Sequence, residues 1–336
     1  MPTNITFRTQ LLGGVYEFCR NSKLQFLADS LNLVELIVLL ARYQEEGVAL
    51  CPRVYITDNI DKLTKMLPGS ERYLIGTGPA NIDGIKSSLK KCAPLATGDW
   101  MIYVADGKDK VEFGVFKGES NPVSVSVDSI LLVPENDFIS VKVSQIAADC
   151  VEVRCNNGDQ HYIFLNHRKE DSPPPLQYLD NLVIAITKEV DDSIKESVRS
   201  YLTRLLYESL RQSHGCIIAV SSTDATPEFL AEDGITLENP INFSSLVSEV
   251  VAKRLDTAYL DSKGVLLKGM LNSDGIIVFN KKAHLLGFNC FVKNNSQEQV
   301  VGGARKRAFA TLGGNIGTHL EAAFMQSQDG WSDFKG

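Results

Sequence analysis

Three consecutive cations, Arg305, Lys306 and Arg307, follow a pair of glycines, Gly302 and Gly303, in a chain that is acidic overall. Glycines can turn the backbone with positive φ and expose its N–H groups, which then face an anion. Arginine binds phosphate oxygens in a bidentate manner, so these residue types suit a polyphosphate. The run predicts a phosphate-binding turn, although an Arg-Lys-Arg sequence taken alone favours a solvated basic turn.

The start of the following helix decides how this run could work. A helix that begins near Ala304 would aim its N-terminal N–H groups and its dipole at the same place as the guanidinium groups. Arg305 and Arg307 are two residues apart and would not share a helix face. We therefore expect both to reach one polyphosphate from the turn itself, before the helix is established.

A carboxylate stands at the head of a hydrophobic strand in "NSDGIIVFN", where Asp274 precedes Gly275. A carboxylate beside a glycine at a strand end suits a metal ion or a hydroxyl that must be deprotonated. Taken alone, the pair favours an ordinary turn. Together with the cationic turn and the intervening strand "LLGFNCF", which contains Gly287, it predicts a nucleotide site.

The composition limits the functions that the chain can have. Its 336 residues suffice for two domains, and a net charge of −7 argues against broad nucleic-acid binding, which needs an excess of Lys and Arg. The N-terminal residues are polar, and the most apolar run, "LNLVELIVLLARY", is shorter than the roughly twenty residues that span a membrane. We expect a cytoplasmic protein without a membrane partner.

Neither the cysteines nor the histidines form a recognisable site. The cysteines include no C-x-x-C pair, so they predict reduced thiols and neither disulfides nor a zinc site. The histidines lack metal-ligand spacing and a nucleophile motif, and only His284, between two strands of the candidate site, is of interest. These residues are Cys19, Cys51, Cys92, Cys150, Cys155, Cys216 and Cys290, and His161, His167, His214, His284 and His319.

A second glycine motif, Gly76-Thr77-Gly78, follows a predicted strand and precedes a predicted helix. A dinucleotide-binding fingerprint needs a third glycine where Asn81 stands, and Pro79 removes a backbone donor. The motif therefore predicts a tight strand-to-helix turn. A nicotinamide-linked oxidoreductase fails on this glycine spacing.

The pattern of helices and strands changes along the chain. Residues 20–95 alternate between the two, and residues 99–165 read as strands, with hairpins at Asp-Gly and Asn-Asn-Gly turns and a further strand in "VSVSVDSILLV". Charged residues and three prolines in "HRKEDSPPPLQ" then mark a boundary. We predict an N-terminal α+β domain at 1–172, a linker at 173–185 and an α/β domain at 186–336.

The second predicted domain opens with a long helix and a short buried strand. The helix, "DDSIKESVRSYLTRLLYESLRQ", carries apolar residues at steps of three and four, and the strand is "CIIAVS". The later segment "GVLLKGML" fits either a helix or a strand.

This second domain resembles the diadenylate cyclase family, whose domain is also found at the front of the DNA-integrity scanning proteins. That family shows Asp-Gly-Ala at a strand start, a glycine-containing strand, Gly-Thr-Arg-His-Arg, and a closing strand with a Ser-rich acidic turn ending in Gly. The corresponding pieces here, in the same order, are Asp274-Gly275-Ile276, "LLGFNCFV", Gly303-Ala304-Arg305-Lys306-Arg307 and "AAFMQSQDG" ending at Gly330. The resemblance covers residues 186–336 and implies a central mixed sheet flanked by helices. The first 170 residues resemble a sensor module sometimes joined to this domain, most clearly in "YQEEGVALCPRVYI".

The resemblance implies an enzyme of bacterial-type second-messenger signalling that condenses two ATP molecules into cyclic di-AMP and two pyrophosphates. Two facing protomers would each present an ATP 3′-hydroxyl to the other's α-phosphate, so a homodimer or higher homo-oligomer is required. Asp274 would lie by the 3′-hydroxyl and a Mg²⁺ or Mn²⁺ ion, while Arg305 and Arg307 would hold the phosphates. The remaining nucleotide contacts would come from Gly275, Ile276, Gly287, Gly303, Ala304, Lys306 and Ser327. The N-terminal domain would regulate the enzyme through a ligand or partner that the sequence does not identify.

Three departures from the family pattern leave a second function open. Ala304 replaces the usual Thr and loses a hydroxyl, and Lys306 replaces His and loses a metal ligand. The closing turn keeps one carboxylate, in Gln328-Asp329, where two are common. Asp274 and both arginines are retained, so we expect activity. The alternative is a domain that binds ATP or a cyclic nucleotide as a sensor without cyclising it.

Overall fold

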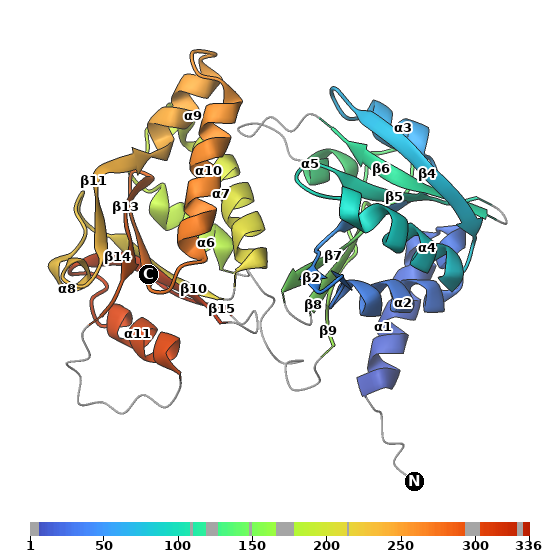
Figure 1. The fold of residues 1–336 in the computed structure, drawn as a ribbon, viewed down its shortest axis with the longest axis horizontal. Helices are drawn as coiled ribbons and strands as arrows, with labels where there is room; N and C mark the ends of the chain where they lie inside the picture. Colours follow the sequence, from blue (N-terminus) through green and yellow to red (C-terminus); the bar gives the residue numbers. More distant parts are fainter. Residues whose placement is uncertain are drawn as a thin grey trace, which may run out of the picture. The chain divides into compact units, whose positions relative to one another are not determined.

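The computed structural model describes residues 7–107, 110–118, 127–147, 150–165, 178–213, 215–292, 303–327 and 332–336. The described residues up to 165 form one compact unit and those from 178 form another, each with its own mixed sheet packed against helices (Figure 1). The chain is therefore a mixed α/β protein with two α/β domains. Among the described residues, no helix combines the length and the apolar character needed to cross a membrane.

The first unit is built on a seven-stranded sheet. Its elements are α1 (Phe7–Ser22), α2 (Ser30–Leu40), β1 (Gln44–Glu45), β2 (Val48–Ala49), β3 (Arg53–Thr57), α3 (Ile60–Lys65), β4 (Glu71–Pro79), α4 (Ile82–Cys92), β5 (Met101–Ala105), β6 (Lys110–Lys117), α5 (Val127–Leu131), β7 (Ser140–Ala147), β8 (Cys150–Cys155) and β9 (Gln160–Phe164), with short 3-10 helices at Gln25–Leu27 and Ala93–Leu95. The sheet order is β4-β6-β5-β3-β7-β8-β9, and β3 and β5 run parallel. Helices α1, α2 and α4 cover one face, while α3 and α5 pack against the other.

Several sequence expectations for this unit are confirmed. The two predicted hairpins join β5 to β6 and β8 to β9. The apolar run forms α2, which begins where the Asp29 carboxylate accepts a hydrogen bond from the Leu31 N–H at 3.0 Å. The tight turn predicted at Gly76-Thr77-Gly78 is wrong, because these residues lie inside β4, which continues to Pro79, and the strand-to-helix turn follows at Asn81, the N-cap of α4.

The strand predicted in "VSVSVDSILLV" is wrong over residues 127–131, which form helix α5, and its earlier residues lie outside the described part of the chain. Val127 and Leu131, one helical turn apart, are both buried. Asp128 accepts hydrogen bonds from the Tyr55 hydroxyl and from the buried Lys142 ammonium group. Burial alone would raise the pKa of Asp128, but Lys142 and Tyr55 lower it to about 2. These long-range contacts favour the helix, and the alternation of apolar and polar residues in the local sequence cannot predict them.

The second unit is built on a six-stranded sheet. Its elements are α6 (Leu179–Ile186), α7 (Asp192–Gln212), β10 (Cys216–Ser221), α8 (Glu228–Ala231), β11 (Ile235–Asn242), α9 (Phe243–Val251), α10 (Thr257–Leu271), β12 (Ile276–Asn280), β13 (His284–Cys290), α11 (Ala304–Gly313), β14 (Leu320–Gln326) and β15 (Ser332–Lys335). The sheet order is β11-β13-β12-β10-β14-β15, with β10 and β12 parallel and the other neighbours antiparallel. One face packs against α6, α7, α9 and α10, and the other packs against α8 and α11 (Figure 1).

Helix α6 belongs to the core of the second unit, because its Leu182 and Ile186 side chains are fully buried there. The unit thus begins before residue 186, and the described part of the predicted linker 173–185 is helical. The proline run of that linker lies outside the described residues.

The predicted long helix and buried strand of this unit are confirmed as α7 and β10. The segment "GVLLKGML", which fitted two structures, lies in helix α10. That helix begins after Asp256, whose carboxylate accepts a hydrogen bond from the Ala258 N–H at 2.7 Å. Its buried residues Leu260, Leu267 and Leu271 recur at helical spacing, which only the full element reveals.

Candidate functional site

A pocket of about 230 Å³ lies at one edge of the six-stranded sheet, where β10 and β12 begin. The two strands are parallel with Ile217 opposite Ile276, so their first residues meet at this edge. The pocket is lined by Ile217, Asp274, Gly275, Ile276, Cys290, Phe291, Val292, Ala304, Arg305, Arg307 and Ala308. Six residues that the sequence proposed for a nucleotide site are among them, namely Asp274, Gly275, Ile276, Ala304, Arg305 and Arg307.

The turn before β12 explains why glycine follows Asp274. Gly275 has φ +98°, a left-handed conformation that favours glycine. A Cβ atom there would lie 2.8 Å from the backbone of Asn289 on the neighbouring strand. The absent side chain lets the chain enter β12 close to β13, and Asp274 is left exposed at the pocket, where its carboxylate accepts a hydrogen bond from the Gly275 N–H at 3.1 Å.

Apolar residues make up much of the pocket lining. Ile217 and Ile276 are almost fully buried neighbours at the starts of β10 and β12. Phe291 and Val292 follow the last residue of β13, and the Phe291 side chain is 40% exposed. A pocket lined by apolar residues and a few charged groups suits a ligand that carries both kinds of surface.

Helix α11 begins at Ala304, as the sequence predicts, with Gly303 as its N-cap. Gly303 has φ −68° and ψ 172°, so the expected positive φ at this residue is wrong, and Gly302 lies outside the described residues. Extended backbone of this kind is open to any residue. Because glycine has no side chain, the first N–H groups of α11 receive no side-chain cap, and the positive end of the helix dipole lies beside the pocket.

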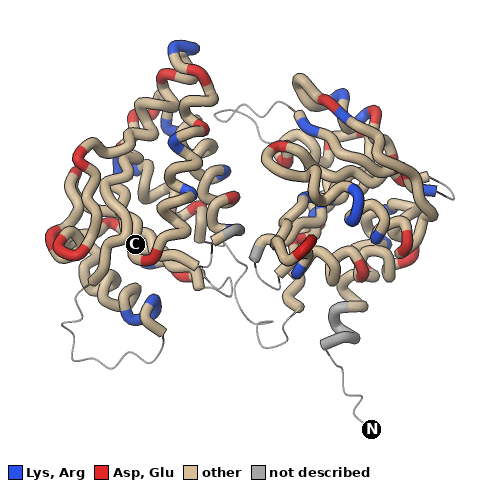
Figure 2. The backbone as a smooth tube through the Cα atoms, viewed as in Figure 1, with Lys and Arg blue, Asp and Glu red and all other residues tan. Residues whose placement is uncertain are grey.

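Arg305 and Arg307 both lie in the first turn of α11 and both line the pocket. The expectation that they act from a turn before the helix is therefore wrong, because the pocket meets the end of the helix rather than one face. Figure 2 shows these cations clustered at the start of α11. The charge of Arg305 also acts on Cys216 at the start of β10. Burial raises the pKa of the Cys216 thiol to about 12, and the Arg305 charge opposes that rise.

Four other predicted site residues do not line the pocket. Gly287 is buried within β13, where a Cβ atom would lie 2.8 Å from the Ile235 carbonyl oxygen, so it serves the close approach of β11. Gly303 and Lys306 stand at the start of α11, outside the lining. Ser327 follows Gln326, the residue paired with Cys216, and therefore lies at the same edge of the sheet but outside the lining. Gln328, Asp329 and Gly330 lie outside the described residues.

The residues around the pocket fit a metal ion that arrives with a phosphate better than a resident one. Within the described ranges, no group of three or more His, Cys, Asp and Glu side chains could hold a metal ion. Asp274 is the only carboxylate among the lining residues. Mg²⁺ is commonly held by one or two carboxylates together with substrate phosphates, and a single Asp beside two arginines fits that arrangement.

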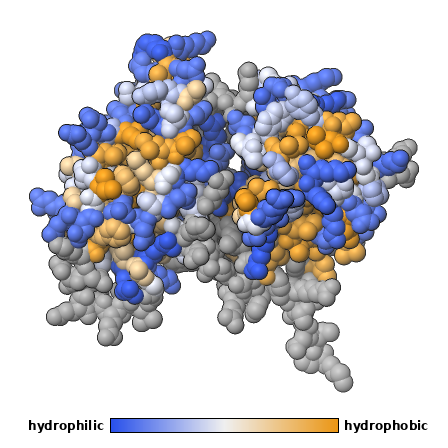
Figure 3. Space-filling view, viewed as in Figure 1, coloured by the Kyte–Doolittle hydropathy of each residue, from blue (hydrophilic) through white to orange (hydrophobic). Residues whose placement is uncertain are grey.

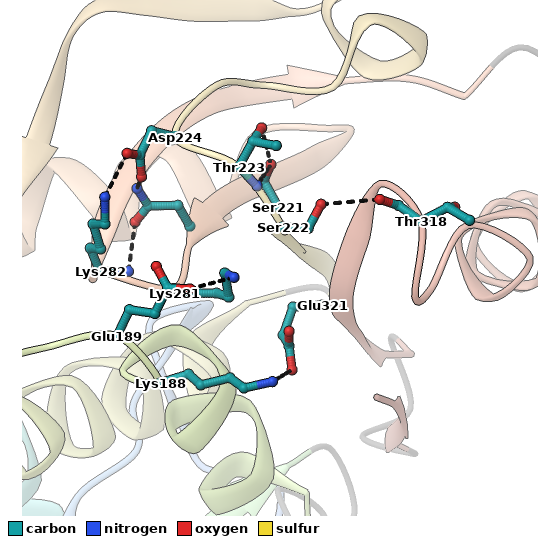
Figure 4. Close-up of polar contacts among 11 residues, drawn as sticks. Lys188, Glu189, Ser221, Ser222, Thr223, Asp224, Lys281, Lys282, Thr318 and Glu321 are labelled. Atoms are coloured by element: carbon teal, nitrogen blue, oxygen red, sulfur yellow. Dashed lines mark hydrogen bonds and ion pairs between the residues drawn. The ribbon is translucent and has the colours of Figure 1, made fainter.

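The opposite edge of the sheet, where β10 and β12 end, holds a second polar cluster (Figure 4). Asp224, in the turn after β10, accepts hydrogen bonds from the Asn280 amide at 3.0 Å and from the Lys282 ammonium group at 2.6 Å. The hydrogen bond from Lys282 lowers the pKa of Asp224. Ser222 donates to the Thr318 carbonyl oxygen at 3.3 Å. These polar groups bind one another and hold the turns at this edge.

His284, the histidine that the sequence placed nearest to the site, lies at this opposite edge. Its backbone N–H donates to the Asn280 side-chain oxygen at 2.9 Å. Burial lowers the pKa of its imidazole, while the charge of Asp224 acts in the opposite direction. The antiparallel pairing of β13 with β12 puts the start of β13 at the far end from the pocket.

Sequence reasoning missed the apolar lining residues Ile217, Cys290, Phe291, Val292 and Ala308. Their positions relative to two predicted strands were visible in the sequence, since Ile217 is the second residue of "CIIAVS" and Phe291 follows "LLGFNC". Only the parallel pairing of β10 with β12 brings them to Asp274. No protein-family model matches the chain, and a search of curated proteins found none with a matching sequence.

Proposed function

We propose that this chain is a diadenylate cyclase, which condenses two ATP molecules into cyclic di-AMP and two pyrophosphates, and that its second unit has the fold of that family. One observation carries the proposal. Asp274, Arg305 and Arg307, the three charged residues on which the resemblance depends, come from two segments, the turn before β12 and the start of α11, and line one pocket. Residues that merely served two unrelated turns would have no reason to meet there.

Phosphate binding is the task of the α11 side of the pocket. Arg305 and Arg307 present guanidinium groups, which hold phosphate oxygens in a bidentate manner, and the uncapped start of α11 adds backbone N–H groups and a favourable dipole. Phosphoryl transfer is catalysed mainly by positioning and by neutralising the charge of the transferring group. These residues therefore supply the larger part of the proposed catalysis.

Asp274 acts on the nucleophile in this proposal. The 3′-oxygen of one ATP attacks the α-phosphorus of the other, the bond to the β-phosphate oxygen breaks, and pyrophosphate leaves. The exposed Asp274 carboxylate accepts the 3′-hydroxyl proton or hands it to solvent. A Mg²⁺ or Mn²⁺ ion held by Asp274 and the phosphates would neutralise developing negative charge.

The size of the pocket supports a half-site. Its volume of about 230 Å³ is below the roughly 300–1,000 Å³ of pockets that enclose a whole ligand. A second protomer that faces it would enclose the rest of the nucleotide and bring the second ATP. On this proposal the enzyme is cytoplasmic, works as a homodimer or larger homo-oligomer, and is regulated by its first unit.

A second function, nucleotide binding without cyclisation, is favoured by a specific observation. Asp274 is the only carboxylate that lines the pocket, and Ala304 offers no hydroxyl there. Such a site would hold a triphosphate with its arginines but would lack a second acidic group. It would make the second unit a sensor for ATP or a cyclic nucleotide.

One experiment separates the two functions. The purified full chain is incubated with ATP and either Mg²⁺ or Mn²⁺, the products are analysed by mass spectrometry, and ATP binding is measured by calorimetry. The cyclase proposal expects cyclic di-AMP and pyrophosphate in a ratio of one to two. ATP binding without any cyclic product under either metal would favour the sensor, and the absence of ATP binding would overturn both.

A further inference from the structure

The outward face of helix α10 is apolar and carries no charge. Its members share one side of the helix, three or four residues apart, and are Ala258, Tyr259, Ser262, Val265, Leu266 and Gly269. Val265 is 70% exposed, and Tyr259 and Leu266 are each close to half exposed. Figure 3 shows apolar side chains gathered over α10. An exposed apolar face of this length marks a contact surface.

The packing of the unit does not require this outward face. Helix α10 already buries Leu260, Gly264 and Leu267 on its inner side, against α7 and α9. Gly264 allows the close approach, since a Cβ atom there would lie 3.0 Å from Leu205. Polar residues on the outer side would leave these contacts unchanged, so the apolar ones serve something else.

We propose that this face docks against the same face of a second copy of the chain, with the two α10 helices antiparallel around a two-fold axis. The face is self-complementary in shape. Tyr259 stands at one end and Gly269 at the other, where a Cβ atom would meet nothing within 4 Å. An antiparallel pair places Tyr259 over the partner's Gly269 at both ends, a bulky residue against an open space.

The charges beside the face agree with the same arrangement. Asp261 and Lys268 lie along one edge of it, and a two-fold axis brings like edges together. The antiparallel direction then sets Asp261 opposite the partner's Lys268 twice. Lys263 lies on the other edge and folds over its own Tyr259 ring, with 5.1 Å between its nitrogen and the ring centroid. A parallel two-fold pair would instead set the edge that carries Asp261 and Lys268 against the partner's other edge, and the pairing of Asp261 with Lys268 would be lost.

This contact is separate from the proposed ATP site, because α10 and α11 cover opposite faces of the sheet. One helix pair buries less than the roughly 1,200–2,000 Å² of a stable interface, so association through α10 is weak and depends on concentration. The inference does not rest on the cyclase proposal, and it can be tested without nucleotide.

The first test measures self-association of the full chain by sedimentation, without nucleotide, over a range of concentrations. Val265→Glu should weaken association at least 10-fold, because it buries a charge at the centre of the contact. Val48→Glu, on an exposed valine of β2 in the other unit, is the matched control and should change nothing. A chain that stays monomeric throughout, or that associates equally well with Val265→Glu, overturns the proposal, provided that thermal unfolding shows both variants folded.

Two further tests fix the geometry. Asp261→Lys and Lys268→Asp should each weaken association, and the double variant should restore it. Mixed Tyr259→Cys and Gly269→Cys proteins should form a disulfide with each other, and neither should do so with itself to the same extent. No rescue in the double variant, or equal cross-linking of Tyr259→Cys with itself, would exclude the antiparallel pair.

Discussion

The two ends of β10 and β12 are both rich in polar residues, yet they are organised differently. Where the strands end, Asp224 binds Asn280 and Lys282, and the charges satisfy one another (Figure 4). Where the strands begin, Asp274 forms no ion pair with the described residues and shares a pocket with Arg305. The comparison shows that a candidate ligand site is identified by charged side chains that line a pocket, and not by the number of charged residues at one end of the strands.

The direction of the strands explains why the pocket lies at an unusual end. In open parallel sheets, ligands bind beyond the carboxyl ends of the strands. Here the neighbours β13 and β14 are antiparallel to β12 and β10, so their last residues stand beside the first residues of the parallel pair. Helix α11 also begins at this edge. Its first backbone N–H groups supply hydrogen-bond donors at the end of the strands where a purely parallel sheet has few.

The largest expected effect comes from replacing the carboxylate at each end of the strands, Asp274 at the pocket and Asp224 in the paired cluster. Asp274→Asn should reduce cyclic di-AMP formation at least about 100-fold, because it removes the proposed proton acceptor, and should leave ATP binding largely intact. Product is measured by mass spectrometry and binding by calorimetry. Asp224→Asn, at the other end, is the matched control and should leave both unchanged. Undiminished product in Asp274→Asn would show that the catalytic assignment is wrong.

A smaller effect is expected at the cations. Arg305→Ala should weaken ATP binding by about 1.5–3 kcal/mol, or roughly 10- to 150-fold, because it removes charge-assisted hydrogen bonds to phosphate. Lys282→Ala removes a cation from the paired cluster and should not alter ATP binding. Calorimetric titration of each variant makes the test, and equal losses in the two would mean that the arginine acts only through overall charge.

The glycine at the pocket edge allows a test of its geometry. Gly275→Ala should lower the free energy of unfolding of the second unit by about 1–3 kcal/mol, because the residue has positive φ and its new Cβ would meet the Asn289 backbone. Gly317→Ala also has positive φ but open space around it, so it should cost less. Urea denaturation compares the two, and equal costs would assign the whole effect to φ.

The smallest expected effect tests the ion pair between Asp224 and Lys282, at the end of the strands opposite the pocket. Lys282→Ala should raise the pKa of Asp224, because the hydrogen bond from Lys282 keeps it low. A lowered folded-state pKa contributes stability above the unfolded value and loses it as the pH falls through the folded value. Wild type and variant should therefore differ near neutral pH and converge in acid. Carboxyl titration by NMR and thermal melts against pH measure both, and an unchanged Asp224 pKa would contradict the pairing.

Sequence reasoning found the charged residues of the pocket because their types are rare in such combinations. Asp274 beside Gly275, and a cationic run at a helix start, can be read from local sequence alone. The regular elements α7, β10 and β12 follow from periodicity in the same way. Local patterns thus carry both the strong elements and the charged half of the candidate site.

The remainder depended on contacts between distant residues. Helix α5 was mistaken for a strand, because its ties to Tyr55 and Lys142 lie far away in the sequence. The apolar lining of the pocket required the pairing of β10 with β12. Gly287 was assigned to nucleotide binding, although its place is fixed by the carbonyl oxygen of Ile235 on the adjacent strand.

The pocket is assembled from segments that begin at Ile217 and end at Ala308, and in the described residues helices α8, α9 and α10 and strands β11, β12 and β13 lie between β10 and α11. The pocket forms only when β10 pairs with β12, so the unfolded chain has no equivalent binding site. By mass action, a ligand at 100 times its dissociation constant should therefore raise the free energy of unfolding by about 2.7 kcal/mol. A ligand of this pocket should therefore raise the melting temperature of the second unit alone. A thermal-shift screen can thus show which unit a ligand binds.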